Sequence, residues 1–444
     1  MNEPTETSVD VDGSAVDPGE DAADEPAIGP TIGPTIGPTG VRTARRHARS
    51  HRRRDRIAFA VTIALLAAAI PAFGYLGVQA VLSSRGGRLV EDTLAPGEPG
   101  YEAIVEPTPV ALIVHTGAGQ LLDLTVLSLA NPGGGGSVLF VPPDTVTDAS
   151  TRAFGFDRLR GAFEVAGVDG VRAATAGVLN ASFTDTIEVD GARWAAMTAP
   201  VAPIRFDNPD AIEGENAAGD EVVFDAGPLE LAADQVGPYL AVGGPGESDL
   251  NRLVRHQLLW EAWVAAVAAS PDPTAAVPGE GGTGLGHFIT RLARGSVVYQ
   301  TLPVDEIEST DERPDAFAPV ATEISTLVAR IIPLPTAAFP GSRVRVRILD
   351  GAGSPETVRA LVEPLVGAGA QVVAIGNADR FTYAATDVRY DSLTPRDQAV
   401  RMQAALGVGD VTSTSFGTDA FDVTIVVGRD LAQRVSEQGA TTTD

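Results

Sequence analysis

The chain has 444 residues and a formal net charge of −26, with 58 acidic against 32 basic side chains. This length allows two domains of about 100 to 200 residues each, besides any terminal segments. The excess of negative charge argues against nucleic acid as a partner of the folded part. The sequence contains no cysteine, which excludes a disulfide scaffold, thiol catalysis and a cysteine-bound metal.

The N-terminal segment, residues 1–40, is of low complexity, because an acidic run precedes repeats of the tetrapeptide IGPT. Proline at every fourth position removes backbone donors, and too few apolar residues are present to offset the chain entropy of folding. We therefore expect a disordered tail here. Residues 41–56 are rich in arginine and form a basic segment.

A long apolar segment without charge, Ile57–Leu82, follows the arginines. About 20 apolar residues in a helix cross a hydrocarbon core of about 30 Å, so the sequence predicts a single transmembrane helix in a lipid bilayer. The segment is too long and starts too late for a cleaved signal peptide, whose apolar core has about 7 to 15 residues. Arginines before it predict a signal-anchor with the N-terminus in the cytoplasm and the C-terminal ectodomain outside the cell membrane.

Residues 83–108 are rich in Gly, Pro and acidic side chains, and we expect a stalk there. Apolar alternation and turn residues then predict a layered α/β domain over residues 109–335. Its expected strands cover residues 109–117, 121–130, 137–145 and 185–189, and its expected helices cover residues 156–180, 191–198, 230–239, 248–270 and 320–332. Ser248 is a suitable N-cap for the longest of the later helices.

Four stretches of this domain are similar to successive landmarks of the LytR-CpsA-Psr family. They read SVLFVPPDT from Ser137, RLRGAFEVAG from Arg158, TIEVDGARWAAM from Thr186 and DLNRLVRHQ from Asp249. Members of that family are membrane-anchored phosphotransferases that move wall polymers from a polyprenyl-pyrophosphate carrier onto the bacterial cell wall. The resemblance implies a layered αβα domain with a role in cell-envelope assembly.

The same resemblance selects five candidate ligand-binding residues. Asp123 falls where the family has the aspartate of its Ser-Asp-Thr strand, and Asp144 belongs to the turn Pro-Pro-Asp-Thr. Asp249, Arg252 and Arg255 match the family's Asp-Phe-x-Arg-x-x-Arg-Gln-Gln helix. Two interpretations stay open at this point: an ion-pair network that holds the helix to the sheet, or a weakened anion site.

Departures from the family pattern concern the chemistry. Pro143 stands where the family has an arginine, the stretch His115–Gly119 lacks the expected acidic metal ligand, and Tyr239–Gly243 lacks two expected arginines. Pyrophosphate transfer requires charge neutralisation by a divalent ion and by arginines. We therefore expect no catalytic residue, no metal site and no cofactor.

The sequence thus favours a non-catalytic binding or scaffold protein related to wall-polymer transferases. Its expected partners are wall polymer or polyprenyl-linked glycan and other envelope proteins, besides the lipid bilayer. The alternative is a phosphotransferase that depends on Mg or Mn and attaches polyprenyl-pyrophosphate-linked glycans to the cell wall. In that case Arg152, Arg158 or Arg160 would supply the missing cations.

Tryptophan and histidine residues offer no further site by spacing. Trp260 and Trp263 lie on one expected helix and are interpreted as core residues. His115, His256 and His287 are scattered, without the close spacing of a zinc site.

A second, smaller α/β domain is expected over residues 341–430, after a proline-rich linker. Strands at residues 343–349, 371–375, 386–390 and 421–427 and helices at residues 355–366 and 395–406 give the order βαββαβ. The stretches RVRVRILDGAG, TDVRYDS and FDVTIVVGRD resemble the LytR C-terminal domain, which implies wall association or protein contact. We expect this domain to fold by itself, and residues 431–444 to form a flexible tail.

Overall fold

A computed structural model describes residues 84–85, 88–89, 94–130, 133–147, 157–215, 221–243, 247–279, 284–307, 316–391, 394–414 and 420–441. The chain separates into two units, Met1–Leu82 and Ser83–Asp444, and the second contains every residue described. The expected tail, basic segment and membrane span at residues 1–82 lie outside the described residues. Among the residues that are described, no helix is long and apolar enough to cross a membrane.

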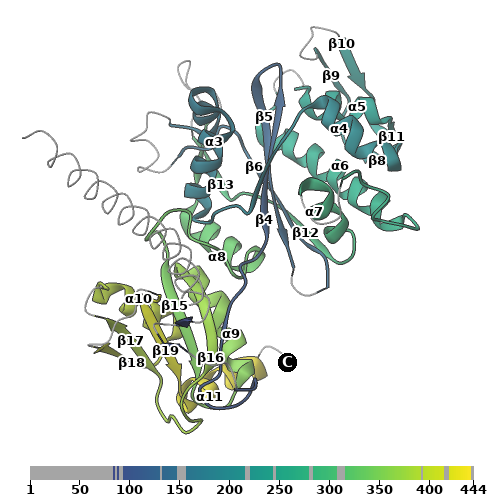
Figure 1. Ribbon diagram of the computed structural model, residues 1–444. Helices are drawn as coiled ribbons and strands as arrows, with labels where there is room; N and C mark the ends of the chain where they lie inside the picture. Colours follow the sequence, from purple (N-terminus) through teal and green to yellow (C-terminus); the bar gives the residue numbers. More distant parts are fainter. Residues whose placement is uncertain are drawn as a thin grey trace, which may run out of the picture. The chain divides into compact units, whose positions relative to one another are not determined.

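The first sheet has five strands in the order β12-β6-β5-β4-β7. Four of them, β12, β6, β5 and β4, are labelled in Figure 1. Strands β4 (Val110–Gly117), β5 (Gln120–Leu129) and β6 (Gly136–Val141) pair antiparallel. Strands β7 (Asp185–Val189) and β12 (Val297–Thr301) add parallel to β4 and β6. These bounds confirm the predicted central strands to within a few residues at each end.

Both faces of this sheet are buried, so its central strands are nearly continuous in apolar residues. Ala111 and Ile113 of β4 face one core, whereas Leu112 and Val114 face the other. The helices covering the face with Leu112 are α3 (Leu159–Leu179) and α8 (Ala321–Ile331). The opposite face is covered by α4 (Gly191–Thr198), α5 (Ala233–Ala241), α6 (Asp249–Ala269) and α7 (Gly284–Leu292). The expected layered αβα arrangement is therefore present.

Between α4 and α5 the chain forms two antiparallel ribbons that the sequence did not suggest. One pairs β8 (Ile204–Asn208) with β11 (Gly227–Leu231), and the other pairs β9 (Ile212–Glu215) with β10 (Glu221–Phe224). The helix expected from residue 230 begins only at Ala233, because the Gln235 side chain accepts the backbone N–H of Ala232 and caps it there. A further ribbon joins β13 (Val304–Ile307) and β14 (Ala316–Pro319).

The second sheet has six strands in the order β18-β17-β19-β15-β16-β3. The predicted βαββαβ series is present as β15 (Val344–Asp350), α9 (Pro355–Gly367), β16 (Ala370–Asn377), β17 (Asp387–Asp391), α10 (Arg396–Leu406) and β19 (Val423–Val427). The structure adds β18 (Asp410–Thr414) before the last strand and α11 (Arg429–Thr441) after it.

The flexible tail expected over residues 431–444 is wrong as far as residue 441, because α11 occupies most of it. Leu431 is fully buried in the core of this domain, and Val435 packs against the same core. The helix start is fastened by Asp430, whose carboxylate accepts the backbone N–H and the hydroxyl of Thr386. Burial of one apolar stripe therefore makes the segment helical.

An early segment completes the second sheet. Strand β3 (Glu102–Ile104), which lies inside the segment expected to be a stalk, pairs antiparallel with β16. Glu102 also accepts a hydrogen bond from the guanidinium of Arg347 at 3.2 Å. The close approach needs glycine at position 376, where a Cβ atom would collide with the carbonyl oxygen of Tyr101. The expected stalk is thus partly a sheet strand.

Candidate functional site

A buried carboxylate, Asp123, lies between two histidines. His115 stands opposite it across the β4–β5 ladder, and its Nδ1 lies 2.6 Å from Asp123 Oδ2. His256 approaches from α6, with its Nδ1 3.6 Å from the same oxygen. In the sequence these histidines lie far apart. Only strand register and helix packing bring them together, so their spacing gave no sign of the cluster.

The protonation of this cluster follows from its contacts. His256 Nε2 lies 3.0 Å from the carbonyl oxygen of Leu240, so Nε2 carries a hydrogen and donates it. Burial lowers the pKa of His256 to about 3, against the attraction of Asp123, and the ring is neutral at pH 7. Burial acts to raise the pKa of Asp123, but the charge and hydrogen bond of His115 outweigh it and hold that pKa below its usual value.

A chain of ion pairs runs from the turn after β6 to the first turn of α6. The Nε and Nη2 atoms of Arg160, at the start of α3, donate to Asp144 Oδ2 at 3.0 and 2.9 Å. Arg158 Nη1 lies 3.6 Å from Asp144 Oδ1. Arg160 Nη2 also lies 3.7 Å from Asp249 Oδ2, and Arg252 Nη2 donates to Asp249 Oδ1 at 2.6 Å. We call these five residues the Asp144 network.

Two guanidinium groups of the Asp144 network also hold the start of β5. Arg160 donates to the carbonyl oxygen of Leu121, and Arg252 donates to that of Leu122 at 3.0 Å. Burial lowers the pKa of Arg160, but the hydrogen bond and charge of Asp144 outweigh it, and the net pKa is raised. The network therefore ties α3 and α6 to the sheet immediately before Asp123.

Arg255 belongs to a separate contact. Its guanidinium forms two hydrogen bonds of 2.7 Å with Glu247 and donates to the carbonyl oxygens of Tyr239 and Val242 at 3.0 and 2.9 Å. Arg255 is only 2% exposed. The structure thus brings Asp144, Asp249 and Arg252 together, places Asp123 next to them along β5, and directs Arg255 elsewhere.

Arginines 158 and 160 are the members of the network that the candidate set lacked. Both lie at the start of the helix that follows Asp144 in the sequence. That position could have identified them, and it is also the reason why they were named as possible replacements for the missing arginines. The third substitute, Arg152, lies outside the described residues.

Three indoles fill the space between the sheet and helices α4 and α6. Trp194, Trp260 and Trp263 are each 1% exposed, and their ring centroids are 5.4 to 5.5 Å apart. Trp194 also contacts the ring of His115 edge-on at 5.9 Å. The interpretation of Trp260 and Trp263 as core residues is confirmed.

The donor set does not fit a divalent metal. Over the described part of the chain, no three His, Asp or Glu side chains are placed to hold a metal ion together. Mg²⁺ requires near-octahedral oxygen ligands that are free to coordinate. Here Asp123 faces an imidazole, and Asp144 and Asp249 face guanidinium groups.

Comparison with known proteins gives one family match and several similar structures. Residues 343–431 match the family model described as LytR cell envelope-related transcriptional attenuator, LytR_C. No curated protein sequence matches the chain.

Among solved structures, TagV of B. subtilis is 15% identical, with a TM-score of 0.42 over 51% of this chain and 97% of that one. TagT of B. subtilis is also 15% identical, with a TM-score of 0.40 over 55% of this chain and 93% of that one. A LytR-CPS2A-psr family protein, YwtF (TagT), with bound octaprenyl pyrophosphate lipid, is 13% identical. Its TM-score is 0.39, over 56% of this chain and 95% of that one.

Proposed function

The chain carries a LytR_C domain at residues 343–431, and we propose that it is a non-catalytic scaffold or binding protein of bacterial cell-envelope assembly. In this proposal Ile57–Leu82 anchors it in the cell membrane as a single-pass protein, with the described residues on the outer side. Its partners are wall polymer or polyprenyl-linked glycan and other envelope proteins.

The observation that supports a non-catalytic role is that the arginines of the Asp144 network pair with carboxylates of the same network. Arg160 spans two carboxylates, and Arg252 binds the second of these as well as a carbonyl oxygen of β5. Breaking the phosphoanhydride bond of a polyprenyl-pyrophosphate carrier requires positive charge and donors directed at the ligand oxygens. These guanidinium groups are directed at the chain itself, so they serve to join helices to the sheet.

One observation favours the alternative, a divalent-metal-dependent phosphotransferase. The Nε of Arg252 and the Oδ2 of Asp249 are buried without a hydrogen-bond partner. One donor and one acceptor of the network could therefore still form a hydrogen bond with a ligand. Turnover would require Arg160 to release its carboxylates and turn toward the substrate.

A turnover assay separates the two functions. We expect the full chain to show no cleavage of a polyprenyl-pyrophosphate-linked glycan with Mg²⁺ or Mn²⁺, while still binding it. The decisive variant is Arg160→Ala with Arg252→Ala, and the control is Arg205→Ala, whose pair with Glu230 is exposed. Metal-dependent turnover that the double variant loses and the control keeps would overturn the scaffold proposal.

Protease treatment of intact spheroplasts tests the proposed topology. Everything after Leu82 should be digested, and the IGPT repeats should be spared. A protected C-terminal domain would contradict this orientation.

A further inference from the structure

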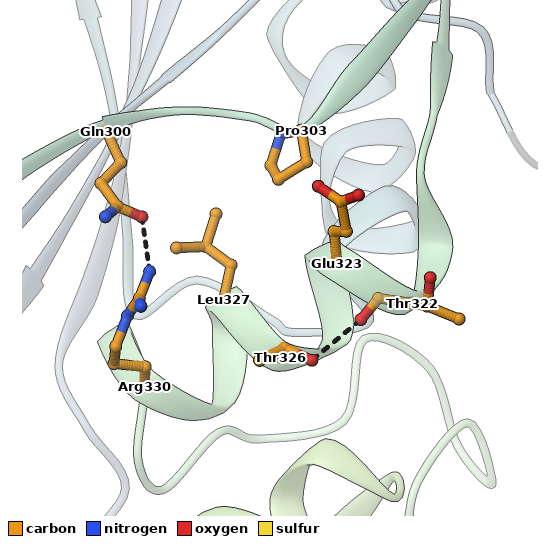
Figure 2. A pocket seen from close by; sticks show the side chains of 7 residues that line it. All are labelled: Gln300, Pro303, Thr322, Glu323, Thr326, Leu327 and Arg330. Carbon is orange, nitrogen blue, oxygen red and sulfur yellow. Dashed lines mark hydrogen bonds between the residues drawn. The ribbon is translucent and has the colours of Figure 1, made fainter.

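A hollow of about 360 Å³ opens between the end of β12 and helix α8 (Figure 2). Seven residues line it: Gln300, Pro303, Thr322, Glu323, Thr326, Leu327 and Arg330. None of them belongs to the Asp144 network, so the hollow is a separate feature of the first domain. Its volume is that of a site for a small ligand.

The two ends of the hollow carry opposite charges. At one end Arg330 Nη2 donates to Gln300 Oε1 at 2.8 Å, which holds the guanidinium at the rim (Figure 2). At the other end stands the carboxylate of Glu323 (Figure 2). Among the described residues Arg330 pairs with no carboxylate, and Glu323 accepts no hydrogen bond and forms no ion pair. Both charges remain available to a ligand.

The floor between these charges is apolar. Leu327 lies between Glu323 and Arg330 in the close view, and Pro303 stands across the hollow from the helix, near Glu323 (Figure 2). The hydroxyl of Thr326 donates to the carbonyl oxygen of Thr322 at 3.0 Å and is thereby satisfied within the helix. A ligand here therefore needs a charged group at each end and an apolar middle.

The spacing of the charges sets the length of such a ligand. Positions 323 and 330 lie two helical turns apart, which corresponds to about 10 Å along the axis at about 1.5 Å per residue. An extended peptide covers about 3.3 to 3.6 Å per residue, so three residues span the same distance. The two charges also complement the dipole of α8, but this does not explain why Gln300 holds Arg330 over the hollow.

We propose that this hollow binds the free ends of a zwitterionic peptide about three residues long. The peptide carboxylate pairs with Arg330, for which the planar guanidinium offers two parallel N–H donors. The peptide ammonium group pairs with Glu323, and the side chains between them lie over Leu327 and Pro303. This site is independent of the function proposed above.

Calorimetric titration of the full chain with trialanine and its blocked forms tests the site without changing the protein. We expect saturable binding of trialanine, about fivefold weaker binding when either end is blocked, and about 25-fold weaker binding when both are blocked, in keeping with exposed ion pairs. Dialanine should bind more weakly because it cannot reach both charges. No saturable binding of trialanine, or equal binding of free and doubly blocked peptide, would overturn the proposal.

Two variants test which residue binds which end of the peptide. Glu323→Gln should no longer distinguish trialanine from its N-acetyl form, and Arg330→Gln should no longer distinguish it from its C-terminal amide. Arg396→Gln, an exposed arginine of α10, should bind trialanine like the unmodified chain. The thermal midpoint of each variant reports any loss of helix stability. Reversed discrimination would contradict the assigned orientation, whereas failure of the peptide site leaves the turnover assay unaffected.

Discussion

His256 shows how a single buried side chain makes the fold sensitive to acid. Its pKa in the folded chain is about 3, below the ordinary value of 6.5 that the unfolded chain has. As pH falls below 6.5 the unfolded chain takes up a proton that the folded chain refuses, so stability falls with pH. The slope for one such group is up to about 1.4 kcal/mol per pH unit.

The expected result is a loss of unfolding free energy between pH 6.5 and 4.5, measured by urea titration of the full chain. His256→Gln, whose amide can still donate to the carbonyl oxygen of Leu240, should flatten this dependence. His287→Gln on α7 serves as the control and should keep it. An unchanged slope in His256→Gln would show that another group titrates.

Arg160 tests the structural role of the Asp144 network. Replacing it with Gln removes one guanidinium partner from each of two carboxylates, Asp144 and Asp249. The side chains of these residues are only 15% and 12% exposed. Removing one partner of a buried pair costs about 3 to 5 kcal/mol, and partial exposure reduces this here to about 1 to 3 kcal/mol.

The matched control is Arg205→Gln, whose pair with Glu230 has both side chains more than 60% exposed and should contribute less than about 1 kcal/mol. Urea unfolding of both variants gives the comparison. Equal costs would show that the network does not hold α3 and α6 to the sheet.

Strand β3 is the element whose placement has the clearest test. Gly376→Ala places a Cβ against the carbonyl oxygen of Tyr101, so β3 should separate from β16 while β16 keeps its parallel partner β15. Hydrogen exchange of residues 102–104 should then become at least about tenfold faster.

Gly367→Ala on α9 is the control, because its Cβ would meet Ala329 at an ordinary distance of 3.8 Å. It should leave the exchange of β3 unchanged. Slow exchange of β3 in Gly376→Ala would mean that the strand tolerates the added methyl group. That residues 341–444 fold alone stays a prediction, and in that fragment the edge of β16 would lack its partner β3.

At the scale of the whole described chain, Arg343 connects the domain built on the first sheet with the domain built on the second. Arg343 is 5% exposed, and its guanidinium donates to the carbonyl oxygens of Asn180, Val366 and Ala370. These carbonyls include the C-terminal ends of α3 and α9, where helix dipoles favour a cation. Burial lowers the pKa of Arg343 to about 10, so it still carries its charge at pH 7.

Arg343→Met should therefore uncouple the two domains. In calorimetry we expect one unfolding transition for the unmodified chain and two for the variant. Arg345→Met, which removes a pair with Asp422 inside the second domain, should keep one transition. A single transition at the original temperature in Arg343→Met would show that the contact is dispensable.

The sequence by itself determined the elements whose signals are local. Strand β4 and helix α6 follow from apolar runs and from the cap at Ser248, which accepts the N–H of Asn251. Helices α9 and α10 of the second domain follow in the same way from apolar periodicity and an early proline. Such signals depend on neighbouring residues, which lie close in the chain whatever the tertiary fold.

Only the tertiary structure decided which distant residues meet. It placed two scattered histidines on Asp123, two further arginines on Asp144, and β3 beside β16. It also gave Arg252 and Arg255 different partners, although they lie three residues apart on α6: Arg252 donates to Asp249, and Arg255 donates to the carbonyl oxygen of Val242. No local pattern encodes these contacts, since each depends on strand register and helix packing across segments far apart in the chain.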